Sequence, residues 1–366
     1  MRRALSVGLA VVLGIGVTFA VVRSARGGGH RANAVTTTLI RGVSGSEKQA
    51  FFQDPEVTAD FAKHGYRLQV DYAGSREIAT LPNLAQYDFA FPAGAPAAEK
   101  ISREHRTVGQ TQPFYTPMTI ATFKPIAELL VRDKVARSFG TGYYQLDMAA
   151  YLALTKRNAR WSDLAGNTAY PTHKSLLVSS TDVRTSNSAA QYLAIASYVA
   201  NGDNVVENRT QSNAVMGTVA PLFLRQGFSA TSSEEPFDDY LSVGIGKTPM
   251  VMIYEAQYLA RAAAHDAALS SDMVLMYPTP TILTKQVAVA LTANGNTVAH
   301  LLATDPDLQR LAVKYGFRSS DAGAMRRYLA KQKVAEPPTL VNVIEPPTYE
   351  VLEYLITSIG RQITGS

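Results

Sequence analysis

The sequence predicts an α/β protein that begins with a membrane-spanning segment. Three observations carry this prediction: an uncharged apolar stretch near the N-terminus, an alternation of strand-like and helix-like segments after it, and glycine–serine turns where a strand leads into a helix. The chain of 366 residues is 46% hydrophobic, which allows two medium-sized domains and a sizeable core.

The N-terminal segment indicates export. Residues 5–22 are uncharged and almost wholly apolar, and Arg2 and Arg3 before them favour a start in the cytoplasm. Residues 32–34 (Ala-Asn-Ala) have the small-x-small form of a signal-peptidase site, so cleavage stays open. Their distance from the apolar run favours a retained anchor, with the glycines at 27–29 as a flexible tether. We expect a single-pass membrane protein with its body outside the cytoplasm, or a secreted protein after cleavage.

Composition excludes several classes of function. The chain has 35 Lys and Arg against 30 Asp and Glu, and residues 1–34 hold five arginines and no acid, so the body is neutral and nucleic-acid binding is not expected. The absence of cysteine excludes disulfides and thiol chemistry. The six histidines are scattered without the spacing of a zinc motif, so we expect no metal site and no cofactor.

Strand and helix patterns alternate along the body. A parallel sheet with right-handed crossovers follows from this alternation. The predicted strands are 36–43, 67–72, 88–91, 117–123, 175–179, 250–254, 273–276 and 286–292. The predicted helices are 47–52, 76–81, 95–103, 125–132, 146–157, 188–201, 213–226, 297–303 and 349–363. Prolines at 113–117 and at 278 indicate two crossings of the chain between α/β units.

Seven segments carry a resemblance to a known superfamily. They are Gly42–Ser46, Tyr72–Ser75, Tyr87–Pro92, Ser179–Asn187, Pro249–Glu255, Tyr277–Pro280 and Leu301–Phe317. In this order and spacing they resemble the type 2 periplasmic solute-binding proteins of ABC transport systems, over about residues 36–320. The resemblance implies two lobes of mixed sheets flanked by helices, joined by hinge strands and enclosing a ligand.

The resemblance also implies a division of the chain. Residues 1–34 are the anchor and tether, 35–115 and 279–330 lobe one, 116–278 lobe two, and 331–366 a C-terminal extension ending in a helix. The implied role is transport or sensing of a small molecule, with a membrane permease as partner and no enzymatic activity.

The expected ligand residues of lobe one follow the first two strands. They are Ser44, Gly45, Ser46, Gly74 and Ser75, because in the superfamily the loop after the first strand faces the cleft. Glycine allows close approach of the backbone, and the free N–H groups of a helix start bind anions. The structural alternative is that Ser46 only caps its helix, a contribution of about 1 kcal/mol.

The expected ligand residues of lobe two are Thr181, Arg184, Ser186, Asn187 and Tyr254. The first four belong to a cluster of hydroxyl, amide and guanidinium groups ahead of a long apolar helix, where Arg184 would form a charge-assisted pair with an anion. The alternative is a polar surface loop with one capping residue. Tyr254 ends a buried strand, and its alternative is a core tyrosine.

Nucleotide binding and catalysis find little support in the motifs. Gly246-Lys247-Thr248 lacks the first glycine of a phosphate-binding loop and precedes Pro249 and a strand-like run. No nucleophile elbow is present. We therefore expect a binding protein whose ligand is an oxyanion such as sulfate, molybdate or phosphate. The alternative is an anchored protein-interaction module with the same fold and no small ligand.

Overall fold

The computed structural model describes residues 37–227 and 230–365. The expected anchor, tether and cleavage site at residues 1–34 lie outside the described residues. Within the described ranges, no helix has the length and apolar character needed to cross a membrane. The described residues all belong to one compact unit.

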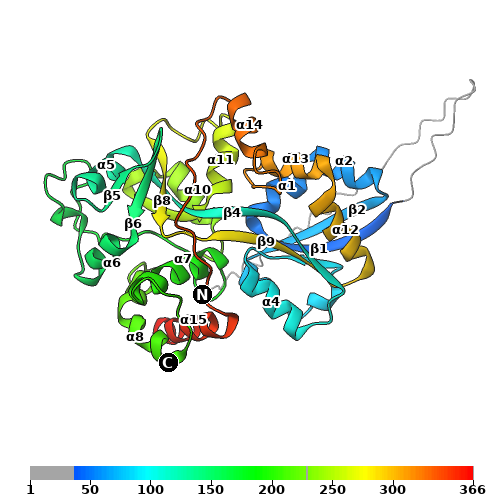
Figure 1. Cartoon of the computed structure of the whole chain (residues 1–366), viewed down its shortest axis with the longest axis horizontal. Helices are drawn as coiled ribbons and strands as arrows, with labels where there is room; N and C mark the ends of the chain where they lie inside the picture. Colours follow the sequence, from blue (N-terminus) through cyan, green and yellow to red (C-terminus); the bar gives the residue numbers. More distant parts are fainter. Residues whose placement is uncertain (1–36, 228–229, 366) are drawn as a thin grey trace, which may run out of the picture. The chain divides into compact units, whose positions relative to one another are not determined.

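A single long strand, β4 (Gly109–Phe123), connects the two halves of the fold. Its first part pairs antiparallel with β9 (Leu283–Ala290), and its second part pairs antiparallel with β7 (Met250–Tyr254) and β8 (Met273–Thr279). Figure 1 shows β4 and β9 side by side between the two halves. β4 therefore belongs to both sheets and connects the two lobes, as expected of a hinge strand.

The sheet of lobe one has the order β2-β1-β3-β9-β4. β1 (Thr38–Gly45) runs parallel to β2 (Tyr66–Ala73) and to β3 (Phe89–Phe91), whereas β3 and β9 are antiparallel. The flanking helices are α1 (Gln49–Gln53), α2 (Pro55–Lys63), α3 (Ser75–Ile78), α4 (Ala95–Glu104), α12 (Ala293–Thr304) and α13 (Pro306–Lys314). Two separate apolar clusters pack against this lobe's strands, so β3 is buried on both sides.

The sheet of lobe two contains β7, β4 and β8, followed by β6 (Tyr143–Asp147) and β5 (Ala136–Ser138). One large apolar cluster fills this lobe. Its helices are α5 (Lys124–Arg132), α6 (Met148–Lys156), α7 (Asn187–Ala200), α8 (Arg209–Val219), α9 (Pro221–Leu224), α10 (Glu234–Ser242) and α11 (Glu255–Ala263). Mixed sheets with flanking helices in two lobes confirm the predicted fold class.

The C-terminal residues pack on lobe two. Side chains of α14 (Ala324–Lys331) and α15 (Tyr349–Thr364) belong to the apolar cluster of lobe two. α15 lies against α7, α8 and α9 and also contacts α4 of lobe one. The last helix therefore spans the boundary between the lobes (Figure 1).

The paired strands β4 and β9 carry the chain from the apolar clusters of one lobe to that of the other. The change lies between Phe114 and Met118, inside β4, and between Ile282 and Val287, at the start of β9. The prolines at 113 and 117 do not interrupt β4; instead its register against β9 shifts between Thr111 and Phe114. The chain thus passes between lobes within paired strands.

Several predictions of individual elements differ from the structure. The segment 175–179 is not a strand. It forms isolated bridges at its ends, Arg160 with Ser175 and Ser179 with Val251, and so short an apolar run has no periodicity that distinguishes a strand. The helix predicted at 213–226 begins earlier and is divided at Pro221, which starts α9. The short strands β5 and β6 and the helices α2, α10, α11 and α14 were not predicted.

Candidate ligand-binding site between the lobes

The two lobes touch along the ends of their strands. Ser46, directly after β1, donates its hydroxyl to the Oγ of Ser232 at 3.0 Å. The backbone N–H groups of Arg76 and Glu77, in α3, donate to the carbonyl of Thr185 at 3.1 and 3.3 Å. The structure is therefore a closed one, in which the predicted cleft loops of lobe one meet lobe two.

Two glycines permit this close contact. A Cβ at Gly74 would lie 2.7 Å from the carbonyl oxygen of Thr185 and 3.0 Å from that of Thr231. A Cβ at Gly94 would lie 2.4 Å from the Oδ1 of Asn187, and its φ of +91° also favours glycine. In the closed structure Gly74, in the second glycine–serine turn, lets the backbone of lobe two come close to lobe one.

The serines of lobe one have separate surroundings. Ser44 is fully buried, and its hydroxyl donates to the carbonyl of Gly45 at 3.3 Å. Ser46 does not cap a helix, because the N-cap of the 3-10 turn that follows β1 is Gly45 and no side chain caps it. Ser75 is buried and accepts a hydrogen bond from the N–H of Ala93 at 2.8 Å, so it joins two loops of its own lobe.

The start of α7 gathers most of the predicted residues of lobe two. Ser186 is the N-cap, and no side chain caps the helix. The hydroxyl of Ser188 lies 2.9 Å from those of Thr181 and Ser186, and the amide of Asn187 donates to the hydroxyl of Tyr254 at 3.2 Å. These five side chains are buried. The first N–H groups of a helix have no intrahelical acceptor, so this cluster offers donors at the lobe boundary.

Arg184 stands apart from this cluster. Its Nε donates to Asp182 Oδ1 at 2.9 Å and to Asp182 Oδ2 at 3.1 Å, and 42% of its side chain is exposed. Burial acts to raise the pKa of Asp182, but hydrogen bonds and the charge of Arg184 lower it overall. In the closed structure the guanidinium of Arg184 is therefore paired with the carboxylate of Asp182.

A buried ion pair that the sequence did not predict, Lys48 with Glu47, lies at the same boundary. Lys48 is fully buried; its Nζ donates to Glu47 and, at 2.7 Å, to Gln286 Oε1, and it lies 4.7 Å from the ring centroid of Phe91. Burial lowers the pKa of Lys48, against the opposite effect of Glu47. Only 4% of the Glu47 side chain is exposed. In sequence the two residues resemble the solvated first turn of a helix, so no signal marked their burial.

A second, partly buried carboxyl group comes from lobe two. Burial raises the pKa of Glu234 to about 7, and the charges of Asp238 and Glu47 add to this effect. Gln257 donates to Glu234 Oε1 at 2.7 Å and accepts from the N–H of Tyr254 at 3.0 Å. The charge of Glu47 acts to raise the pKa of both Glu234 and Tyr254, and Tyr254 in turn accepts a hydrogen bond from Asn187 at the start of α7.

Comparison with known proteins supports this architecture. No protein-family model matches the sequence, and no curated protein matches it. Among solved structures, the periplasmic binding protein AfuA from Actinobacillus pleuropneumoniae, with fructose-6-phosphate bound, is similar with a TM-score of 0.57 and 12% identity, over 89% of this chain and 99% of that one. The sulfate-binding protein SubI from Mycobacterium tuberculosis H37Rv has a TM-score of 0.54 and 14% identity, over 86% and 96%.

A third similar structure, iron-bound HitA from Pseudomonas aeruginosa, has a TM-score of 0.54 and 11% identity, over 89% of this chain and 99% of that one. The three proteins bind different ligands and share the architecture, so the similarity concerns the fold. It extends over nearly the whole body of this chain and agrees with the order of segments found in the sequence. The chain therefore has the two-lobed fold of the type 2 periplasmic solute-binding proteins.

Proposed function

We propose that this protein is an extracytoplasmic solute-binding protein that encloses a small ligand between its lobes for transport or sensing. The observation that carries the proposal is the start of α7, which is buried at the lobe boundary without a side-chain cap. Hydroxyl and amide groups of Thr181, Ser186, Asn187 and Tyr254 surround it. Such a set of oriented donors suits ligand binding better than catalysis.

An oxyanion such as sulfate, molybdate or phosphate is the first candidate ligand. α7 is a helix of 14 residues, long enough for its N-terminus to carry a partial positive charge. Its first amides, with the hydroxyls beside them, can replace the hydration shell of an anion without a lysine cluster. The neutral body of the chain agrees with a site that depends on oriented donors.

A solute with an amino group beside an anionic or hydroxyl group is the second candidate. Glu47 and Glu234 favour it, because a carboxylate from each lobe near the donors of α7 would repel a free oxyanion and attract a cationic group. Partial protonation of Glu234 near neutral pH reduces the repulsion of an anion, so an oxyanion remains a candidate. Both ligand classes are therefore included in the same experiment.

The anchored interaction module has less support. Gly45, Gly74 and Asn187 are buried between the lobes, where a macromolecular partner would reach them only after the lobes separate. In the proposed setting the body lies outside the cytoplasmic membrane, held by residues 1–34 or released from them, and delivers its ligand to a membrane permease.

A thermal-shift screen of the purified full-length protein tests the proposal. The panel contains sulfate, molybdate, phosphate, amino acids, sugars and polyamines. A ligand at 100 times its Kd adds about 2.7 kcal/mol to the free energy of unfolding. Asn187→Ala removes a donor at the start of α7 and should weaken the shift. Asn204→Ala, on the exposed loop after α7, is the matched control and should leave the shift unchanged.

Each outcome of the screen has a meaning. If no panel member shifts the melting temperature, or if Asn187→Ala binds as well as wild type, the proposed site is wrong. Arg184→Ala distinguishes two forms of the proposed site. If the variant still binds, the ligand is held by the donors at the start of α7. If binding is lost, Arg184 must leave Asp182 and pair with the ligand.

A further inference from the structure

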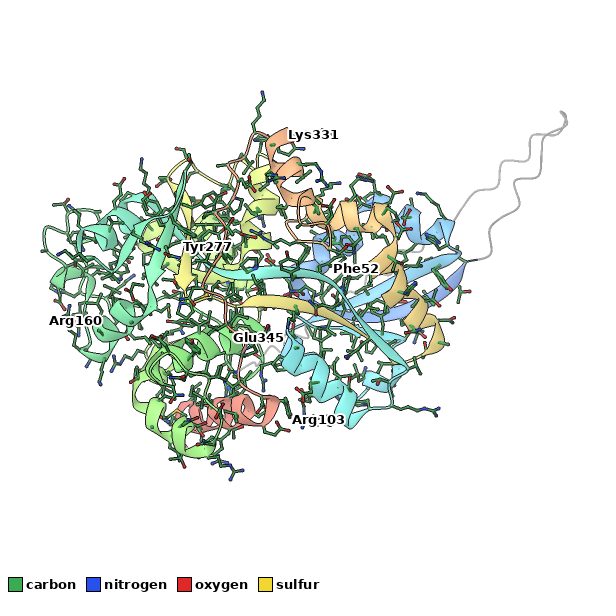
Figure 2. The ribbon with its side chains drawn as sticks, viewed as in Figure 1. Phe52, Arg103, Arg160, Tyr277, Lys331 and Glu345 are labelled. Carbon is green, nitrogen blue, oxygen red and sulfur yellow. The ribbon has the colours of Figure 1, made fainter. Side chains whose placement is uncertain are left out.

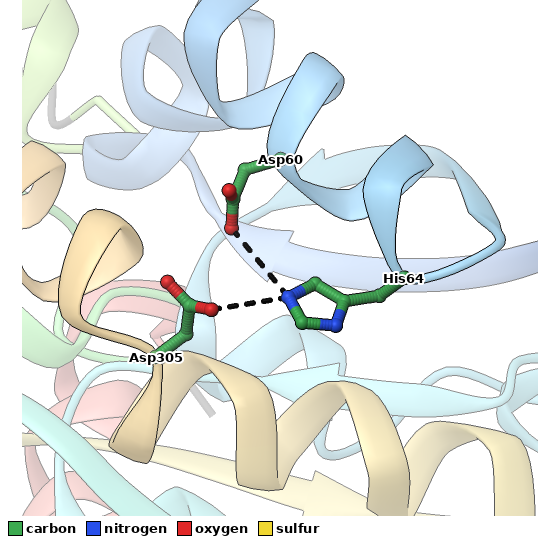
Figure 3. Close-up of side chains that lie close together, drawn as sticks. All are labelled: Asp60, His64 and Asp305. Carbon is green, nitrogen blue, oxygen red and sulfur yellow. Dashed lines mark hydrogen bonds and ion pairs between the residues drawn. The ribbon is translucent and has the colours of Figure 1, made fainter.

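We propose that Asp60, His64 and Asp305 form a site for a divalent transition metal ion such as Zn²⁺, on lobe one and separate from the interlobe site. Figure 3 shows the three side chains converging, Asp60 and His64 from the end of α2 and Asp305 from the start of α13. The Nε2 of His64 lies 3.0 Å from Asp305 Oδ2 and 4.0 Å from Asp60 Oδ2. One ligand atom from each residue lies within 4.8 Å of the others.

An unsatisfied buried oxygen points to a missing ligand at this cluster. Asp60 is only 3% exposed, and its Oδ2 is buried without a hydrogen-bond partner among the described residues. Its other oxygen, Oδ1, accepts from Lys63 Nζ at 2.8 Å. A buried carboxylate oxygen without a partner is unfavourable, and a cation bound beside it would remove this penalty.

The surrounding structure already orients the three ligands. Asp60 and His64 are four residues apart at the end of α2, so their side chains lie on one face. Asp305 precedes α13, where its Oδ1 accepts from the N–H groups of Asp307 and Leu308 at 2.8 and 3.1 Å. This capping contact fixes the carboxylate and leaves Oδ2 facing His64, as a second-shell hydrogen bond does for a metal ligand.

The distances fit a small ion after minor adjustment. Zinc bonds of about 2.0–2.1 Å with tetrahedral angles separate neighbouring ligand atoms by about 3.3 Å. The contacts of His64 with Asp305 and Asp60 at 3.0 and 4.0 Å differ from this value by less than the reach of a side-chain rotation. A mixed imidazole and carboxylate set suits zinc and similar transition metals, whereas calcium and magnesium prefer oxygen ligands alone.

The charges of the cluster agree with a cation of charge two. Lys63 also lies 3.7 Å from Asp307 Oδ2, so one ammonium stands among the carboxylates of Asp60, Asp305 and Asp307. A bound ion would link α2 to α13. Its ligands His64 and Asp305 are 241 positions apart in the chain. No metal site was expected because the six histidines are scattered without the spacing of a zinc motif, and Asp305 lies far along the chain from Asp60 and His64.

Isothermal titration of Zn²⁺ into the full-length protein, stripped beforehand with a chelator, tests the site. Wild type should bind one equivalent, and Asp60→Asn and His64→Gln should each weaken the Kd at least about tenfold. His300→Gln, an exposed histidine on α12 of the same lobe, is the matched control and should bind like wild type. Lys63→Gln should bind at least as tightly as wild type, because it removes a nearby positive charge.

Three results would overturn the site: no zinc binding by wild type, unchanged binding in both ligand variants, or displacement of zinc by equimolar calcium. Equal melting temperatures of wild type, Asp60→Asn and His64→Gln in chelator would show that the variants remain folded. Because none of these measurements involves the interlobe ligand, their failure leaves the proposed solute-binding function standing.

Discussion

Arg76 of α3 and Glu353 of α15 form a bidentate ion pair that joins lobe one to the C-terminal helix. Nη1 donates to Oε1 at 2.6 Å and Nη2 to Oε2 at 2.8 Å, and the side chains are only 11% and 25% exposed. Since α15 packs on α7, α8 and α9 of lobe two, this pair holds the lobes together from outside the ligand site. Arg76 Nε also donates to the carbonyl of Arg184 at 3.3 Å.

Glu353→Gln should favour opening of the lobes. The variant loses a charge-assisted bidentate pair, which contributes about 1–3 kcal/mol to the closed state. In the proposed function the lobes enclose the ligand by closing, so the apparent affinity for an interlobe ligand should fall with the closed population. Small-angle X-ray scattering of the ligand-free protein checks the expectation as an increased radius of gyration.

Glu350→Gln is the matched control on the same helix. Glu350 pairs with Arg103 of α4, where α4 approaches α15 (Figure 2), but both side chains are about half exposed, at 59% and 49%. Exposed pairs contribute about 0–1 kcal/mol. If both variants open the protein equally, total charge and not the partly buried pair of Arg76 and Glu353 controls closure.

The pKa of Glu234, raised to about 7 by burial and nearby acids, predicts a pH-dependent stability. The folded state binds a proton more tightly than the unfolded state, whose pKa is near 4.5. Between these values the folded state carries more protons, so this group's contribution makes stability fall as pH rises from about 4.5 to about 7. Glu234→Gln should remove that part of the slope and be more stable than wild type at pH 8.

Urea denaturation at several pH values measures the slope. Glu235→Gln is the matched control, because Glu235 is the next residue along α10 and is exposed. It should leave the pH dependence of wild type unchanged. An unaltered slope in Glu234→Gln would mean that this carboxyl group titrates normally and is not desolvated.

The order of elements could be predicted because fully buried strands keep a strong apolar pattern. Every residue of β7 is buried, and its apolar run is visible in the sequence. β5 and β6 are short and partly exposed, so their residues carry no comparable pattern. The extent of β4 was underestimated, because Pro113 and Pro117 suggested breaks whereas the strand accommodates them with a shift in register.

The site was partly predictable for a different reason. Glycine–serine turns after strands mark loops that approach another backbone, and Gly74 does approach Thr185 closely. The burial of Lys48 depends on Gln286, which lies 238 positions away on β9, so no local pattern signals it. Arg184 illustrates the same limit. Its partner Asp182 is only two residues away in sequence, but whether the guanidinium pairs with that carboxylate or with a ligand depends on the closed structure.

Glu255→Gln should destabilise the hinge. Glu255 is fully buried and accepts from Tyr277 OH at 2.6 Å and from Nε and Nη2 of Arg318, both at 2.8 Å. An amide turned toward Arg318 leaves the guanidinium without its counter-charge. We expect a loss of about 3 kcal/mol, near the low end for buried pairs because a quarter of the Arg318 side chain is exposed.

Urea denaturation also tests this hinge contact, with Tyr277→Phe as the comparison. That variant removes only the neutral donor and should lose about 1 kcal/mol (Tyr277 lies centrally in Figure 2). If the two variants were equally stable, the charge of Glu255 would have no special role between the lobes. A change in ligand affinity without a change in stability would instead assign Glu255 to the ligand.

The buried pair of Glu47 and Lys48 predicts a strongly non-additive double variant. Lys48→Met leaves the carboxylate of Glu47 buried without its partner and should lower the free energy of unfolding by about 3–5 kcal/mol. Adding Glu47→Gln removes that uncompensated charge, so the double variant should recover most of the loss, and chemical denaturation of all four proteins gives the coupling energy. If the losses in free energy of unfolding of Lys48→Met and Glu47→Gln simply add in the double variant, water reaches Glu47 in solution and the lobes are open more often than closed.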